Sequence, residues 1–324
     1  VQTSGGLHDP RLDMHEAYFA LKPTRDERFY LFAGRQELNY GDHLIVGSVP
    51  WHRIGRSFDG ARIRYKPFEE LKVDAFISKI DENNAAATDS KKLDGDFSGV
   101  YLSISPSAFL KEADLYLLKR GHQQTGDFHQ TNAYGLRLKS PVGSTAFDYR
   151  AEGTLEQVQL AGESSWQKSE FQADLEVGYK LPWYSARIAL EVFWASRHYD
   201  QLFPTAHKFL GYADQFSRRN IKGQVVHFTI MPFEKFYFLS AYHLFERQDT
   251  DRPAYGFTGN GLGNVGGKAS VAKELDLVAA YDFTKALQLS AGHSWVTPGP
   301  YLKDQGGGVN AETKWSYLQL LVRF

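Results

Sequence analysis

Charged side chains recur at every second position along short segments of this sequence. Arg62 and Arg64 occupy alternate positions in the segment 61–65, whose other members are apolar or aromatic. A β-strand places successive side chains on opposite faces, so this segment has one charged face and one apolar face. A helix would instead need apolar spacings of three and four. The pattern predicts a wall that presents ions on one side and hydrocarbon on the other.

The same alternation returns along the chain, most clearly in segments 147–152, 171–179, 187–194, 274–281 and 317–324. It predicts about fifteen strands of roughly ten residues, which is close to the length that crosses a bilayer at a tilt. The connections between them alternate between short turns and long polar loops. We expect the long loops near residues 39–56, 81–94, 197–219, 248–268 and 297–312. Short turns on one rim and long loops on the other are typical of an outer-membrane barrel.

Composition agrees with strands that cross a membrane. Aromatic residues make up 15% of the chain, the mean hydropathy is -0.42, and no apolar run is long enough for a transmembrane helix. Many aromatic residues fall near the expected strand ends, among them Trp183, Trp194 and Trp295. Such rings form girdles at the two lipid–water boundaries of a barrel. The alternative is that aromatic residues simply favour strands.

The fold class that follows is all-β: one transmembrane antiparallel β-barrel over residues 1–324, located in the bacterial outer membrane and in contact with its lipid. A closed barrel with both termini on one side has an even number of strands, so we expect about 16–18 strands in the complete barrel. The first strand or strands are therefore expected to precede Val1, or residues 1–7 contribute a short one.

Several function classes are excluded or disfavoured by the residues. Lys plus Arg total 37 and Asp plus Glu total 38, so the formal net charge of -1 offers no field that would attract nucleic acid. Cysteine is absent, which excludes disulfides and thiolate metal sites. The 11 histidines are scattered, and no catalytic or phosphate-binding motif is present. We expect no enzyme activity, no cofactor and no metal site.

One stretch of the sequence carries a family resemblance. It runs through Gly34-Arg35-Gln36 and Tyr40-Gly41-Asp42 to Gly47, Trp51 and Arg56, ending in Phe58-Asp59-Gly60. This pattern resembles the alginate export family of outer-membrane porins, and the resemblance covers roughly residues 12–80. His43 departs from it, since the family commonly has an arginine before the following leucine. The resemblance implies a porin-like channel for passive passage of hydrophilic solutes. It also implies an anionic saccharide as solute, because alginate-type polymers are polyuronates.

The residues of this stretch also permit a physical interpretation. Glycines at 41 and 47 allow backbone conformations that favour a loop folded into the lumen. Asp42, together with Arg53 or Arg56, could fix that loop to the wall by charge-assisted bonds. The alternative is a well-packed loop with no function. The expected pore-constricting loop contains Tyr40, Gly41, Asp42, Gly47, Trp51 and Arg56.

The positions of the charged residues within the alternating segments predict which side chains line the lumen. A charge on the lipid face would cost about 2–4 kcal/mol at mid-membrane, so charged side chains should face inward. The expected pore-lining and solute-binding residues are Arg35, Glu37, Arg62, Arg64, Arg137, Asp148, Arg150, Glu152, Asp174, Arg187 and Glu191.

Arginines should gather on one wall of the lumen and carboxylates on another. Arg35, Arg62 and Arg64 would form a basic patch, and a transverse field between the two walls would orient solutes. Because arginine binds carboxylates with two parallel hydrogen bonds, anionic or sugar-acid solutes are favoured. A non-selective hydrophilic pore, whose lumen charges merely pair with one another, remains an alternative.

Two other function classes fit the same fold. A structural or adhesive barrel would conduct nothing, and a barrel subunit of a larger envelope complex would dock a protein partner on its long loops. Conductance would separate the first from a channel, and co-purification of a stoichiometric partner would identify the second.

Overall fold

The computed structural model describes residues 14–23, 28–50, 55–80, 95–105, 110–121, 128–140, 145–305 and 311–323. Strands dominate it, and the helical elements are the 3-10 turn η1 (Ala206–Lys208) and the short helix α1 (Pro300–Lys303). The strands are β1 (Ala17–Leu21), β2 (Phe29–Gln36), β3 (Phe58–Phe68), β4 (Leu71–Ile80), β5 (Asp96–Ile104), β6 (Glu112–Gly121), β7 (Phe128–Lys139), β8 (Phe147–Leu160), β9 (Trp166–Lys180), β10 (Arg187–Ala195), β11 (Ile221–Ile230), β12 (Phe236–Arg247), β13 (Ala254–Tyr255), β14 (Gly261–Leu262), β15 (Ser270–Thr284), β16 (Leu287–Pro298) and β17 (Thr313–Val322).

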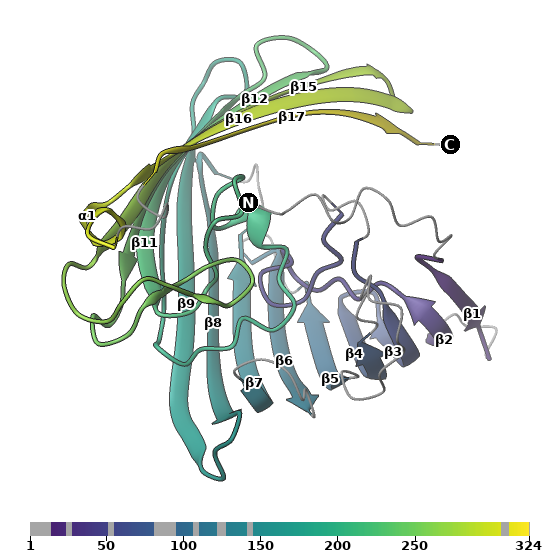
Figure 1. Cartoon of the computed structure of the whole chain (residues 1–324). Helices are drawn as coiled ribbons and strands as arrows, with labels where there is room; N and C mark the ends of the chain where they lie inside the picture. Colours follow the sequence, from purple (N-terminus) through teal and green to yellow (C-terminus); the bar gives the residue numbers. More distant parts are fainter. Residues whose placement is uncertain are drawn as a thin grey trace.

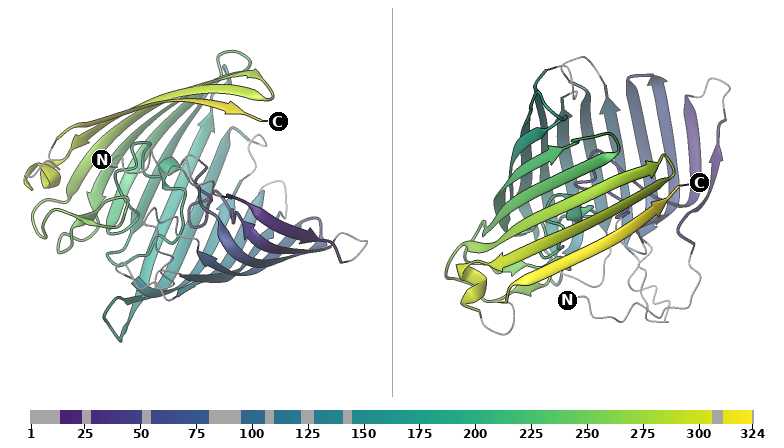
Figure 2. Two further views of the ribbon diagram at one scale, coloured as in Figure 1. Left: turned by 45° about the vertical axis from the view of Figure 1, so that its right-hand side comes forward. Right: turned by 90° about the horizontal axis from the view of Figure 1, so that it is seen from above.

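Fifteen of these strands form one antiparallel sheet in which each strand pairs with the next along the chain. The prediction of about fifteen crossing strands is confirmed. The sheet curls around a central space, with β1 and β17 at its two edges (Figures 1 and 2). In the described part of the chain these two edge strands do not pair with each other. The expectation that further strands precede Val1 stays a prediction.

The two faces of the sheet differ in the way that alternation predicts. On β6, Leu115 and Leu117 are 53% and 55% exposed. The alternating residues Tyr116 and Leu118 are only 2% and 3% exposed. Exposed apolar side chains cover the outer face of the other strands in the same manner. In an aqueous protein such a surface would be unstable, so the outer face is suited to lipid. No helix among the described residues is long and apolar enough to span a membrane.

The apolar core lies inside the curled sheet and is built from inward-facing strand residues together with loop residues. Residues 37–50 and 55–57, between β2 and β3, form what we call the first inward loop, and residues 196–220, between β10 and β11, form the second inward loop. Phe203 of the second inward loop packs against Phe58 and Phe97 of the wall, with ring centroids 5.5 and 4.6 Å apart. Both loops therefore lie within the lumen, as their position in the curled sheet also shows (Figure 1).

A charge placed on the outer face should destabilise the barrel. Leu115→Arg puts a guanidinium near the middle of the apolar band, and we expect the free energy of unfolding to fall by about 2–4 kcal/mol. Urea-induced unfolding in phospholipid vesicles, followed by tryptophan fluorescence, measures the change.

The matched control is Gln224→Arg, because Gln224 pairs with the outward-facing Val192 and lies near the long-loop rim. There the same charge should cost about 1 kcal/mol or less. Equal stability of the two variants would contradict the assignment of the outer face to lipid.

Candidate functional site

The inner face of the sheet carries most of the charged residues that the sequence singled out. Alternation and pairing register place nine of them there: Arg62, Arg64, Arg137, Asp148, Arg150, Glu152, Asp174, Arg187 and Glu191. Among these, Asp174 and Glu191 are almost fully buried by their neighbours. Contact of these residues with a solute stays a prediction.

Arg35 does not belong to this set, and its predicted position in the lumen is wrong. The register pairs Arg62 with Phe32, and the Arg62 guanidinium lies 4.3 Å from the Phe32 ring, so Phe32 faces inward. Arg35 has the opposite parity to Phe32 and therefore faces outward. Its guanidinium donates two hydrogen bonds to the Asp59 carboxylate, with N–O distances of 2.8 and 2.9 Å. Aromatic type favours a lipid-facing position for Tyr30 and Phe32, and Arg35 has the opposite parity to both, but these two rings lie beneath the cations of the inner wall.

The same register also decides the positions of Gly34 and Glu37 beside Arg35. Gly34 pairs with Gly60 and takes the inner parity. Glu37 lies one residue beyond the end of β2, where its carboxylate bonds to the His15 ring at 2.7 Å and accepts a hydrogen bond from the Asn39 amide at 2.8 Å. Glu37 is therefore part of the rim beside β1, and these local partners occupy its carboxylate.

Two arginines share one carboxylate on the wall formed by β3 and β4. Arg64 donates two hydrogen bonds of 2.7 Å to Asp74, and a nitrogen of Arg62 lies 3.8 Å from the same carboxylate. Asp74 is fully buried beneath them. Since two guanidinium groups face one carboxylate, this group of three residues retains a net positive charge.

Carboxylates predominate on the wall formed by β8 to β10. Arg150 and Arg218 both pair with Asp174, at 2.8 Å each, and Arg187 pairs with Glu176 at 2.6 Å. Arg218 comes from the second inward loop, so the loop contributes to neutralising the wall. The acidic residues of this wall include Asp148, Glu152, Asp174, Glu176 and Glu191.

One cluster on this wall has the composition of a metal site. Ligand atoms of Glu176, Glu191 and His227 all lie within 4.8 Å of one another. A nitrogen of Arg150, however, lies 3.4 Å from a carboxylate oxygen of each glutamate. The guanidinium already neutralises the two carboxylates, so the cluster fits an ion-pair network better than a cation site.

The first inward loop lies against the inner wall. The Tyr40 ring stacks on Tyr101 with centroids 4.4 Å apart. Gly41 follows with φ of +56°, and a side chain there would press against Arg137 and Tyr101. Asp42 then accepts hydrogen bonds from Arg137 at 2.6 and 3.0 Å and from Lys139 at 2.6 Å.

The wall partners of Asp42 come from β7, 95 residues away in the sequence. Arg53, which we expected to fix the loop together with Asp42, lies outside the described residues, and Arg56 bonds to carbonyls of the loops rather than to the wall. Burial alone would raise the pKa of Asp42, but Lys208, Arg137 and Lys139 outweigh it and hold this pKa well below its usual range. Asp42 is therefore ionised at neutral pH and fixes the loop to the wall.

Arg56 and Gly47 join the first inward loop to the second. Arg56 donates hydrogen bonds to the carbonyls of Gly47 at 3.0 Å and Pro204 at 3.1 Å, and burial lowers its pKa to about 10. The Gly47 N–H donates to the Phe203 carbonyl at 2.8 Å. Any side chain at position 47 would meet the Thr205 hydroxyl, so glycine is required by this close approach. Trp51 lies outside the described residues.

The second inward loop spans the lumen from wall to wall. At one end Asp200 pairs with Arg120 of β6 at 2.6 Å. At the other end the Ala213 N–H donates to Glu274 of β15 at 2.9 Å, and the Tyr212 N–H donates to Asp276 at 3.3 Å. We predicted residues 197–219 to be a long polar loop and missed this arrangement. The available signal was its aromatic and aliphatic content, which includes Phe203, Phe209, Leu210 and Phe216.

Removing the charge of Asp42 should loosen the first inward loop. In Asp42→Asn the charge-assisted hydrogen bonds from Arg137 and Lys139 weaken, and we expect the free energy of unfolding to fall by about 2–3 kcal/mol. Hydrogen exchange should accelerate at the Tyr40 and His43 amides, which donate to Val46 and Tyr40 within the loop. Amides of the sheet should exchange as before.

Asp59→Asn is the matched control, because Asp59 also pairs with an arginine but is 45% exposed. An exposed pair contributes about 1 kcal/mol or less. Unchanged exchange in the first inward loop of Asp42→Asn would show that the ion pair does not hold it.

The same ion pair should persist in mild acid. A carboxylate whose pKa is lowered on folding stabilises the folded state above its ordinary pKa, and this stabilisation is lost only as the pH falls through the lowered value. We therefore expect the amides of the loop to stay protected at about pH 4, near the ordinary aspartate pKa. Loss of protection above that pH would contradict the strong pairing of Asp42.

Comparisons with known proteins agree with this architecture. The crystal structure of OpdP (OccD3) from Pseudomonas aeruginosa superposes with a TM-score of 0.63 at 14% identity, covering 96% of this chain and 78% of that chain. OpdQ from the same organism gives a TM-score of 0.60 at 13% identity, covering 94% and 81%. The outer membrane protein OprD, again from Pseudomonas aeruginosa, gives 0.59 at 15% identity, covering 91% and 76%. These similarities establish the fold.

No curated protein sequence matches the chain. The model of the alginate export family, by contrast, matches residues 8–315. This match extends the resemblance first seen in the motif of residues 34–60 to almost the whole sequence, and it agrees with a location in the bacterial outer membrane. The chain therefore belongs to the alginate export family.

Proposed function

We propose that this protein is a porin-like channel through which hydrophilic solutes pass passively, with a preference for anionic solutes such as sugar acids. Neither a cofactor nor a catalytic step is required. The fold shared with outer-membrane porins and the ion-lined inner wall support the channel. The preference for anions rests on the way in which the charges of the wall are exposed.

The observation that carries the proposal is the unequal exposure of ion-pair partners. The Asp74 side chain is 0% exposed, whereas its partner Arg64 is 24% exposed. The Asp42 side chain is 10% exposed, whereas its neighbours Lys139 and Lys208 are 26% and 57% exposed. The carboxylates therefore lie beneath the cations at these positions, and a solute in the lumen would meet positive charge first.

This arrangement suits a carboxylate-bearing solute. Guanidinium groups bind carboxylates with paired hydrogen bonds. Because Arg62 and Arg64 already share Asp74, their attraction for a second carboxylate is moderated. Conduction needs binding that is favourable enough for entry and weak enough for exit, and partly neutralised arginines meet both needs.

The two inward loops would set the width of the passage. They are joined to each other through Gly47 and Phe203 and to opposite walls through Asp42 and Glu274. A solute must pass beside these loops, close to the exposed ammonium group of Lys208 on the second inward loop. The passage would therefore be narrowest at the same depth at which it carries the positive charge of Lys208.

A non-conducting barrel is the second candidate function, and one observation favours it. The two loops bury a continuous apolar cluster inside the lumen, with Phe203 and Phe209 among its members. If that cluster closed the lumen, the charges would serve only stability. Purified protein in a planar bilayer would then produce no current steps, whereas a channel produces steps that scale with salt concentration.

Removal of two cations of the lumen, Arg62 and Lys208, should reduce anion preference. In Arg62→Gln with Lys208→Ala, Asp74 keeps its two hydrogen bonds from Arg64, so no buried carboxylate is left alone. Each lost charge changes the local energy of a nearby ion by up to about 1 kcal/mol in water. We expect the chloride-to-potassium permeability ratio to fall by up to about fivefold per charge, as measured by the reversal potential in a KCl gradient.

Lys273→Ala is the control, because it removes one positive charge from the outer face of β15 and leaves the lumen intact. Its reversal potential should equal that of the wild type. A wild-type preference for cations, or a double variant with an unchanged ratio, would refute the preference for anions.

A further inference from the structure

Polar side chains occupy the outer face of the barrel at the long-loop end of β5 to β8. Lys119 alternates with Arg120, whose side chain points inward to Asp200, so Lys119 points outward. The register extends this outward row from Lys119 to Ser98 on β5 and to Asn132 on β7. Gln157 of β8 continues it beside Asn132.

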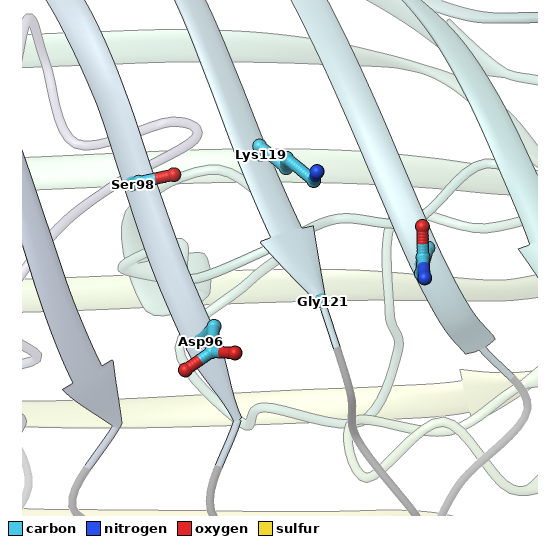
Figure 3. Close-up of a pocket in the computed structure, with 5 residues that line it drawn as sticks. Asp96, Ser98, Lys119 and Gly121 are labelled. Atoms are coloured by element: carbon cyan, nitrogen blue, oxygen red, sulfur yellow. The ribbon is translucent and has the colours of Figure 1, made fainter.

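A hollow opens on the outer wall at this place. It has a volume of about 260 Å³ and is lined by Asp96, Ser98, Lys119, Gly121 and Gln130. Figure 3 shows Asp96 and Ser98 on one strand and Lys119 beside them on the next, with Gly121 leaving room at the end of β6. The lining therefore combines a cation, a carboxylate, a hydroxyl group and an amide.

Several of these polar groups have no protein partner in the part of the chain that the structure describes. Asp96 pairs with Lys79 across the strands. No hydrogen bond or ion pair from another described residue reaches the side chains of Ser98, Lys119, Gln130, Asn132 and Gln157. Their bonding capacity is directed outward, away from the lumen.

The hydrocarbon boundary lies directly beside this polar strip. Two residues closer to the short turns on each strand, the next outward-facing side chains are those of Val100, Leu117, Tyr134 and Leu155. Leu117 and Leu155 are 55% and 61% exposed. Long loops mark the external side of an outer-membrane barrel, so the strip lies at the level of the lipid headgroups of the external leaflet.

We propose that this hollow binds the phosphorylated saccharide headgroup of a glycolipid in the external leaflet. Lys119 would pair with a phosphate, as lysine does when it acts as a point charge toward phosphate oxygens. Ser98, Asn132 and Gln157 would exchange hydrogen bonds with sugar hydroxyl groups. The acyl chains would then lie along the Leu117 row directly beneath.

The chemistry favours a glycolipid over a second protein chain. The occupant must present hydroxyl and phosphate oxygens to the polar strip and hydrocarbon to the adjoining row, in that order along the membrane normal. An acylated phosphosaccharide has this polarity in one molecule. An unpaired lysine such as Lys119 also finds its countercharge in a phosphate, as basic side chains at membrane surfaces do.

Native mass spectrometry of the detergent-solubilised protein tests the proposal, with bisphosphorylated lipid A as the added probe. We expect the wild type to bind one lipid A and Lys119→Ala to bind it roughly tenfold more weakly, from the loss of one charge-assisted contact. Lys273→Ala removes an outward lysine from the opposite part of the rim and should bind like the wild type. Lipid A that lacks phosphates should bind the wild type and Lys119→Ala with the same weak affinity.

A second variant guards against an effect of Lys119 on folding. Asn132→Ala with Gln157→Ala leaves all charges in place and should weaken binding of both lipid A forms by a similar factor. Equal affinity of Lys119→Ala and Lys273→Ala, or indifference to the phosphates, would overturn the proposal. A wild-type dimer that carries no lipid and dissociates on Lys119→Ala would assign the strip to a protein interface instead.

Discussion

Hydrocarbon around the barrel is the constraint on which this structure depends. A charge on the outer face costs about 2–4 kcal/mol at mid-membrane, so the strands must turn their charged side chains inward. Many charged side chains are then crowded into the narrow interior, and most of them must form ion pairs. Shared carboxylates such as Asp74 and Asp174, each with two arginine partners, are the result. Pairing lowers the cost of burial while leaving edges of the cations exposed.

The inward loops follow from the same constraint. A barrel of this circumference encloses more space than its wall side chains fill, and the loops supply the missing contacts. The first inward loop brings Asp42 to two cations of β7, and the second brings Arg218 to Asp174. Each loop therefore satisfies charges that the strands alone leave incomplete. The passage is defined jointly by wall and loops, so its chemistry includes loop residues such as Lys208.

Local periodicity was enough to predict the strands, the barrel class and the inward position of residues such as Arg62, Asp148 and Arg187. It failed at Arg35, because Tyr30 and Phe32 are apolar by type and yet lie on the inner face beneath cations. It also could not identify the partners of Asp42 or the course of residues 196–220, since those contacts join distant parts of the chain. Side-chain alternation describes one strand at a time, whereas such contacts depend on how the whole sheet curls.

The 95-residue separation between Asp42 and Arg137 also bears on how the protein assembles. Closing a long segment of chain costs conformational entropy before any contact repays it, and such contacts form slowly. Arg137 reaches its final position only when β6 and β7 have paired. The contact that fixes the first inward loop therefore requires the β6–β7 hairpin. We expect the loop to dock after that hairpin has formed, so that the interior is filled only once the strands have paired.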